Sequence, residues 1–192
     1  MIKKAVLFLL VFAMFTACED DVLQQPLFEY AMNNPADSGS RYPNLYVDDS
    51  GRMYMSWLVN IEEDITALQY TTYKDERWTE PKTVQIDTNF FMNWADFPSV
   101  VGINGTELAA HWLKKVEGGT YAYHVQLNFF NDETNRWNEP ITPHLDGTAT
   151  EHGFVSLEPL SSDKVLAVWL DGRETEGRAH DEYEDISKSM TL

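Results

Sequence analysis

The chain has 192 residues and a formal net charge of −17, with 43% hydrophobic and 13% aromatic residues. So acidic a chain is a poor partner for nucleic acid or other polyanions, because phosphate contacts need lysine and arginine. The hydrophobic and aromatic content is sufficient for a packed core, which excludes disorder of the whole chain.

Residues 1–17 have the pattern of an export signal. Lys3 and Lys4 precede an apolar run that is shorter than the about 20 residues of a typical membrane span. The run ends in Phe15-Thr16-Ala17-Cys18, which resembles the lipobox of bacterial lipoproteins, and Cys18 is the single cysteine of the chain. We predict that residues 1–17 are removed and that lipid-modified Cys18 is the only attachment to the membrane. The alternative is an unpaired thiol in an ordinary secreted protein.

An acidic cluster, Glu19-Asp20-Asp21, follows the cysteine directly. Its position resembles the surface-export signal of lipoproteins from the Bacteroidetes group, and a solvated charge run is the alternative interpretation. Residues 18–40 have the composition of a tether. We expect an outer-membrane lipoprotein exposed at the cell surface, with a periplasm-facing orientation as the alternative.

The rest of the chain is organised around a segment that ends in Trp-Leu and occurs three times, at 52–58, 107–113 and 164–170. Each copy is preceded by an aromatic-led pair of residues, and the pairs are Tyr42-Pro43, Phe97-Pro98 and Phe154-Val155. A turn signal lies between each pair and its Trp-Leu segment. The first two copies are also followed by a Trp-x-Glu-Pro segment, at Trp78 and at Trp137. A fixed period with matching aromatic residues and turns indicates a repeat architecture.

The repeated units are rich in β-branched and aromatic residues, which predicts strands. In the first unit we expect strands near 44–48, 53–59, 67–73 and 82–86. Four short antiparallel strands in about 55 residues make a unit slightly longer than the about 40–50 residues of a usual β-propeller blade. The middle strands are apolar on both faces, as at 165–170, which is typical of a strand between two neighbouring sheets. We therefore predict an all-β fold of propeller blades, with Trp57, Trp112 and Trp169 in their cores.

The units span residues 42–96, 97–151 and 152–192, which is about two and a half blades. A closed propeller has about 4–8 blades. We therefore expect residues 41–192 to be an incomplete propeller. We expect these residues to be part of a longer protein or of a truncated reading frame. The alternative is that several chains close a ring together as an oligomer.

Over roughly residues 40–192 the chain resembles the sialidase-like (BNR/Asp-box) β-propeller family. Ser40-Arg41-Tyr42-Pro43 partly matches the family's aromatic-Arg-Ile-Pro motif, with Arg41 and Pro43 in place. The Asp-box, Ser-x-Asp-x-Gly-x-Thr-Trp, is matched at Asp132 and Trp137 in the second unit, while Phe130, Thr134 and Arg136 depart from it. In the first unit only Thr71 and Trp78 fit.

The resemblance implies an exo-sialidase-type glycoside hydrolase that acts on a glycan. Such an enzyme needs arginines to hold a carboxylate, a tyrosine nucleophile and an acid/base carboxyl group. The resemblance makes Arg41 the carboxylate-binding residue and Asp96 the acid/base, with a surface ion pair and a turn residue as the alternatives. No nucleophile can be assigned, because the remaining family residues would lie beyond Leu192. We therefore expect this chain alone to be inactive, and a non-catalytic propeller that binds a glycan or a protein is the alternative function.

Two polar segments flank the third Trp-Leu copy: Glu151-His152 precedes it and Asp171-Gly172-Arg173 follows it. Antiparallel strands would bring the two segments to the same end of the unit. We predict that Glu151, His152, Asp171 and Arg173 line a polar pocket, and local turns with one ion pair are the alternative. The spacing of the five histidines predicts no zinc site, and there is no glycine-rich phosphate loop, so we expect neither a metal nor a cofactor.

Overall fold

The computed structural model describes residues 29–176 and residue 191. The chain divides into two units, residues 1–32 and 33–192; of the first, residues 29–32 are described and carry no regular secondary structure. The expected signal segment, Cys18 and most of the expected tether lie outside the described residues. No helix in the part of the chain that is described is long and apolar enough to cross a membrane. The strands described for this chain all belong to the second unit, residues 33–192.

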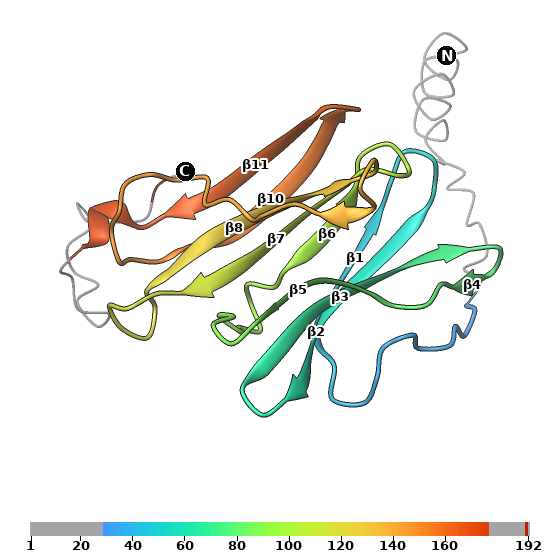
Figure 1. The fold of residues 1–192 in the computed structure, drawn as a ribbon, viewed down its shortest axis with the longest axis horizontal. Helices are drawn as coiled ribbons and strands as arrows, with labels where there is room; N and C mark the ends of the chain where they lie inside the picture. Colours follow the sequence, from blue (N-terminus) through green and yellow to red (C-terminus); the bar gives the residue numbers. More distant parts are fainter. Residues whose placement is uncertain (1–28, 177–190, 192) are drawn as a thin grey trace, which may run out of the picture. The chain divides into compact units, whose positions relative to one another are not determined.

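Three antiparallel sheets follow one another along this unit (Figure 1). The first contains β1 (Arg41–Val47), β2 (Met53–Glu62), β3 (Ile65–Lys74), β4 (Arg77–Trp78) and β5 (Lys82–Asp87). The second contains β6 (Ser99–Gly102), β7 (Leu108–Lys115), β8 (Tyr123–Asn131) and β9 (Arg136–Trp137). The third contains β10 (His152–Ser161) and β11 (Lys164–Asp171), followed by the 3-10 turn η1 (Arg173–Thr175). The prediction of an all-β chain of antiparallel sheets is confirmed.

The four strands expected in the first unit correspond to β1, β2, β3 and β5. The structure extends β2 to Glu62 and starts β3 at Ile65, because their ladder continues to a tight turn at Glu63-Asp64. Asp64 closes this turn in the left-handed backbone conformation, with a φ of 63°. The sequence did not predict this extension, because Asn60 and Glu62 are poor strand formers and are held in the ladder by pairing alone.

The Trp-x-Glu-Pro segments end their sheets in the same way. In the first sheet, β4 and β5 both pair with β3, and Pro81 stands between them. Proline has no N–H to donate, so it interrupts the ladder between β4 and β5. In the second sheet, β9 pairs with β8 and Ile141, directly after Pro140, forms a further bridge to Leu127.

β1 and β10 share one irregularity near their starts. The register shifts by one residue within 41–44 in β1 and within 153–156 in β10. At these bulges Tyr42 and Phe154 adopt left-handed backbone, with φ of 57° and 54°. These are the leading residues of two of the three aromatic pairs found in the sequence, so in these two units the repeat in sequence corresponds to a repeat in backbone conformation.

Beyond the bulges, the three first strands have equivalent pairing. In each sheet a polar residue of the first strand faces the residue just before the repeated tryptophan, and the pairs are Asn44–Ser56, Ser99–His111 and Ser156–Val168. Each sheet is thus built on the same register between its first and second strands.

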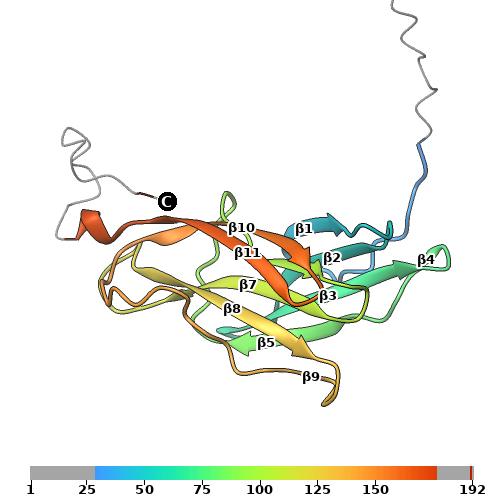
Figure 2. The same cartoon turned by 90° about the horizontal axis from the view of Figure 1, so that it is seen from above.

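The sheets pack against one another through two apolar clusters. One joins the first and second sheets and includes Tyr54, Leu68 and Trp112. The other joins the second and third sheets and includes Leu113 and Leu157. Figure 2 shows β7 and β8 between the β10–β11 hairpin and strands β3 and β5, as these clusters require. The second sheet is therefore covered on both faces, which explains why the residues 108–113 of β7 are all buried.

The backbone of β6 comes close to the first sheet at Gly102. A Cβ atom at this position would lie 2.6 Å from the ring of Tyr54. The absence of a side chain is thus what allows this tyrosine to pack closely against β6.

The third sheet is covered on one face only by the described residues. The side of β11 that carries Val165, Ala167 and Trp169 packs on the second sheet. Leu166 and Val168, on the other side, are exposed by 47% and 38%. The sequence predicted that both faces of residues 165–170 would be covered, and within the described chain only one is.

We expect the cluster at Trp112 to dominate the packing of the first two sheets. Trp112→Ala removes a side chain that is 2% exposed, which typically costs about 3–5 kcal/mol of unfolding free energy. Trp94→Ala is the matched control, because Trp94 is 82% exposed and its loss should change stability by no more than about 0.5 kcal/mol. Urea denaturation of both variants measures the difference, and similar losses would contradict this account of the core.

Candidate functional site

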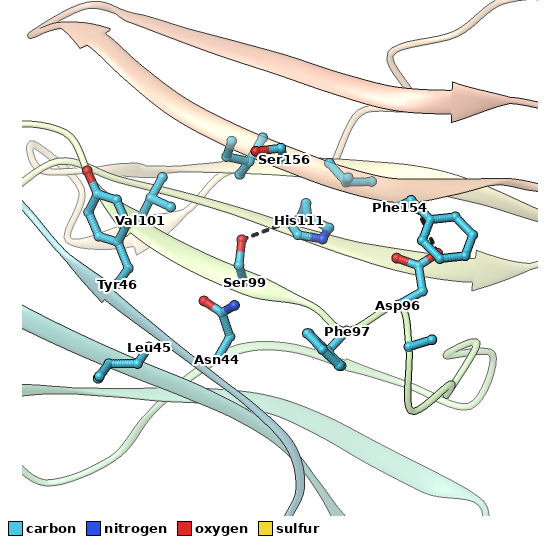
Figure 3. A pocket seen from close by; sticks show the side chains of 13 residues that line it. Asn44, Leu45, Tyr46, Asp96, Phe97, Ser99, Val101, His111, Phe154 and Ser156 are labelled. Carbon is cyan, nitrogen blue, oxygen red and sulfur yellow. Dashed lines mark hydrogen bonds between the residues drawn. The ribbon is translucent and has the colours of Figure 1, made fainter. Parts of the chain in front are cut away.

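A cavity of about 390 Å³ opens where the first strands of the three sheets meet (Figure 3). β6 contacts both β1 and β10, so the cavity has one wall from each sheet. Its polar lining includes the equivalent residues of the three registers, Asn44, Ser99 and Ser156. Its apolar lining includes Tyr46, Phe97 and Phe154. Small-molecule sites combine apolar residues with a few placed polar groups, and this cavity offers both.

Asp96 is the carboxyl group of this cavity and is only 4% exposed. Burial raises the pKa of Asp96 to about 6, even though its oxygen accepts hydrogen bonds from the backbone N–H groups of Phe154 and Val155. The Oδ2 atom lies 2.8 Å from the Phe154 nitrogen. Near pH 6 this group therefore exchanges a proton readily, which is the property of an acid/base group.

Asp96 also fixes the bulge of β10. A Cβ atom on Gly153 would lie 2.1 Å from the Asp96 carboxylate, so only glycine allows the carboxylate to reach the backbone there. The neighbouring Phe154 keeps its left-handed conformation while its ring, 46% exposed, stands at the cavity (Figure 3). A strained, partly exposed aromatic residue beside a buried carboxyl group is an arrangement often found at functional sites.

A serine and a histidine form a second polar pair in the cavity. Ser99 Oγ lies 2.8 Å from His111 Nδ1, and both side chains are buried (Figure 3). Burial lowers the pKa of His111 to about 4, so the ring is neutral at pH 7. The pair thus presents an uncharged donor and acceptor to the cavity beside the ionisable Asp96.

Arg41, the predicted carboxylate-binding residue, is exposed at the start of β1. It pairs with Leu58 in the ladder and is not one of the residues that line the cavity. The structure therefore does not bring Arg41 and Asp96 into the same recess, although both directly precede the aromatic residue of their repeat.

Three of the four residues predicted to line a polar pocket come together at the start of β10 and the end of β11, and the Glu151 side chain is not among them. His152 pairs with Asp171 in the ladder, and its Nε2 atom lies 3.5 Å from Asp171 Oδ1. Arg173 donates to both carboxylate oxygens of Asp171 and lies partly in solvent. Glu151 accepts a hydrogen bond of 2.6 Å from the Tyr123 hydroxyl. The ion pair of the alternative interpretation is therefore present within a larger polar assembly.

Three further residues of this assembly were not predicted. His124 is at the start of β8, and His144 and Asp146 precede β10. Together with His152, Asp171 and Arg173 they form what we call the histidine–carboxylate cluster. His144 Nδ1 and His152 Nε2 lie 3.0 and 3.3 Å from Asp146 Oδ2.

One signal in the sequence was available for part of the cluster. His144 and Asp146 are two residues apart, and in an extended chain such residues point to the same side. Leu145 between them is 96% exposed, as this alternation requires. His124 and His152 gave no such signal, because they are brought in by the pairing of different strands.

The carboxylates of the cluster are held in the ionised form. Burial acts to raise the pKa of Asp146, but hydrogen bonds from the Thr148 hydroxyl and backbone N–H outweigh it and the pKa is lowered. Hydrogen bonds from the Arg173 side chain lower the pKa of Asp171 to about 2. The cluster therefore keeps two negative charges at neutral pH beside three imidazole rings.

Comparisons of the chain with protein-family models, with curated proteins and with solved structures found no match.

We predict that Asp96 makes the stability of the protein depend on pH. Its folded-state pKa of about 6 is above the value of about 3.9 for an unfolded aspartate, so the folded state keeps the proton longer as pH rises. Ionisation of this group should therefore lower the free energy of unfolding of the wild type by roughly 2–3 kcal/mol between about pH 4 and pH 7. Asp96→Asn still accepts the Phe154 N–H but cannot ionise, and it should lack this loss.

Urea denaturation at several pH values measures this effect. The stability of Asp96→Asn relative to the wild type should improve as the pH rises from 4 to 7. Asp163→Asn, at the exposed β10–β11 turn, makes the same chemical change and should show no such trend. A relative stability of Asp96→Asn that does not change with pH would contradict the raised pKa.

Proposed function

We propose that residues 41–192 are part of a sialidase-like β-propeller that binds a glycan, in a lipid-anchored protein of the cell surface. One observation carries the proposal: the cavity is lined by equivalent residues of three first strands, Asn44, Ser99 and Ser156. In a propeller, the first strands of successive blades surround the central channel, and ligands bind at its mouth.

The packing of the sheets supports the propeller. Trp112 and Trp169 each belong to a second strand and pack toward the preceding sheet. Trp57, their counterpart in the first sheet, is also buried, but it packs with Val59, Ala67 and Ala36 of the segment before β1. On this proposal, Ala36 and its neighbours occupy part of the face where a ring-closing blade would pack.

The uncovered face of the third sheet has the character expected for contact with a further blade. Leu160, Leu166 and Val168 are large apolar residues that are exposed on β10 and β11. Exposed apolar faces of this kind mark sites of association. We propose that further blades cover this face, supplied either by additional chain or by other copies that complete an oligomeric ring.

The chemistry of the cavity suits a saccharide. Tyr46, Phe97 and Phe154 offer apolar faces, while Asn44, Ser99 and Asp96 offer hydrogen-bonding groups. Sugar rings need both, because one surface of the ring is apolar and its edge carries hydroxyl groups. With a pKa of about 6, Asp96 is suited to act as the acid/base of an exo-sialidase-type hydrolase.

In such a hydrolase Arg41 would hold the substrate carboxylate near the start of β1. The repeat supports this assignment, because Arg41 is the counterpart of Asp96 in the preceding sheet. A nucleophile is not assigned, and the described chain is proposed to lack turnover without further blades.

A non-catalytic glycan- or protein-binding propeller is the second candidate. The observation that favours it is that, within the described residues, no arginine lines the cavity. A cavity without arginine is better matched to a neutral glycan than to a carboxylated one. The lipid anchor at Cys18 and the surface location rest on the sequence pattern of residues 1–21 and belong equally to both candidates.

The binding of oligosaccharides tests the part that both glycan-binding candidates share. We expect sialyllactose or lactose to bind the full-length chain, and ligand-observed NMR to detect contact with the sugar ring. Phe154→Ala and Asn44→Ala should weaken binding about 10-fold, by loss of the apolar face and of one hydrogen bond. Leu160→Ala on the same strand is the control, because Leu160 is exposed and does not line the cavity. If neither sugar binds, or if both cavity variants bind as well as the wild type, the proposed glycan site is wrong.

Turnover of a fluorogenic sialoside separates the two glycan-binding candidates. In a preparation where the ring is complete, a hydrolase should lose activity as the pH rises through about 6, because the acid must carry its proton. Asp96→Asn should lower kcat by at least about 100-fold, and Arg41→Ala should mainly weaken carboxylate-dependent binding. Sugar binding without turnover at any pH would support the binding propeller and exclude the hydrolase.

A further inference from the structure

The histidine–carboxylate cluster lies outside the cavity, and its function does not depend on the proposed glycan site. The potential ligand atoms of His144, Asp146 and His152 all lie within 4.8 Å of one another. In a tetrahedral site with metal–ligand bonds of about 2.0–2.1 Å, ligand atoms are about 3.3 Å apart. The distances of 3.0 and 3.3 Å from the two histidine nitrogens to Asp146 Oδ2 are close to this separation.

The hydrogen bonding of His152 leaves a lone pair on its Nε2 atom, which faces two carboxylate groups. His152 Nδ1 lies 3.2 Å from the carbonyl oxygen of Thr150, which only accepts, so Nδ1 carries a proton. In the neutral ring Nε2 then has a lone pair, and its nearest charged neighbours are Asp146 Oδ2 at 3.3 Å and Asp171 Oδ1 at 3.5 Å. The side chain is fully buried and Nε2 has no hydrogen-bond partner. Three acceptors in contact require a positive charge between them, either a proton or a metal ion.

The surrounding groups orient the cluster as the supporting residues of a metal site do. A backbone carbonyl fixes His152 through Nδ1, and the Thr148 carbonyl fixes His124 through Nε2 at 3.0 Å. Asp146 Oδ1 accepts the Thr148 N–H at 2.9 Å, which leaves Oδ2 free to face the histidines. Metal-binding histidines and carboxylates are usually held by such outer hydrogen bonds.

His144 is the ligand that must move. Its ring is stacked on that of His152, with centroids 3.9 Å apart and planes 3° from parallel. An imidazole binds a metal in its own plane, so two parallel stacked rings cannot direct their lone pairs at one ion. To share an ion with His152, the His144 ring would have to turn, which breaks no hydrogen bond at its unpartnered Nε2, and its Nδ1 proton would move to that nitrogen.

The charge of the cluster favours a cation. Asp146 and Asp171 contribute two negative charges and Arg173 one positive charge. Arg173 Nη2 lies 3.9 Å from Asp146 Oδ2, but its guanidinium group is engaged by Asp171 through Nε at 2.9 Å. Calcium and magnesium prefer sites made of oxygen alone, whereas two imidazoles and one carboxylate suit zinc and its neighbours.

We propose that His144, Asp146 and His152 bind a divalent transition metal ion of the zinc class. The metal joins the segment before β10 to the first residue of that strand and so stabilises the start of the third sheet. The spacing of these residues in the sequence had suggested no zinc site, because His152 is eight residues from His144 and is brought to it by the fold.

Zinc titration of the full-length, tag-free chain tests the proposal. After treatment with a chelator, calorimetric titration with zinc chloride should show one site per chain, and zinc should raise the thermal unfolding temperature. Asp146→Asn and His144→Gln should each weaken zinc binding by at least about 100-fold. Asp163→Asn is the matched control for the loss of a carboxylate and should bind zinc like the wild type.

A second measurement on the wild type guards against variants that fail to fold. ¹⁵N NMR of the imidazole nitrogens should show zinc-dependent changes at Nδ1 of His144 and Nε2 of His152. If the folded wild type binds no zinc, the metal site is wrong. Zinc binding that persists in both variants, or that leaves these two nitrogens unchanged, would equally overturn it. Glycan binding plays no part in any of these outcomes, so the two proposals are tested separately.

Discussion

The structure depends on covering both faces of sheets whose middle strands are apolar on either side. β7 satisfies this condition, because the first sheet covers Trp112 and the third sheet covers Leu113. Burial of such side chains is the main favourable term in folding and has no direction of its own. The specific arrangement of the sheets comes from the repeated register, which places the repeated tryptophan at the equivalent position of each second strand. Stacking in chain order follows, and it leaves one face of β10–β11 exposed within the described chain.

The stacking has a consequence for chemistry, because it brings the first strands together. A residue such as Asn44, Ser99 or Ser156 would be an ordinary polar residue in an isolated sheet. Around the shared cavity, the three become one polar lining. Asp96 gains its raised pKa from the same packing, since the carboxyl group is buried where the bulge of β10 meets the second sheet. The aromatic residue at that bulge, Phe154, is held in a strained conformation by the hydrogen bond that Asp96 accepts.

The histidine–carboxylate cluster shows a different use of the same junction. It is assembled from β8, the segment before β10 and the end of β11, so it joins the second and third sheets by polar contacts. Buried polar groups require partners, and here Thr148, Thr150 and Arg173 supply most of them. The Nε2 atoms of His144 and His152 are left without partners, which distinguishes this cluster from a structural network in which every group is satisfied.

The sequence by itself determined the four main strands of the first unit, the repeated organisation and the buried tryptophans Trp57 and Trp112, because β-branched and aromatic runs, turn residues and the Trp-Leu period are local properties of the chain. It also placed Asp96 as a candidate and brought His152, Asp171 and Arg173 to one end of the third unit, since antiparallel pairing of adjacent strands follows from local order. Only the tertiary structure decided that Arg41 lies outside the cavity and that His124 and His144 join His152. Those relations depend on how separate sheets pack, and packing is fixed by shape and burial between residues far apart in the sequence.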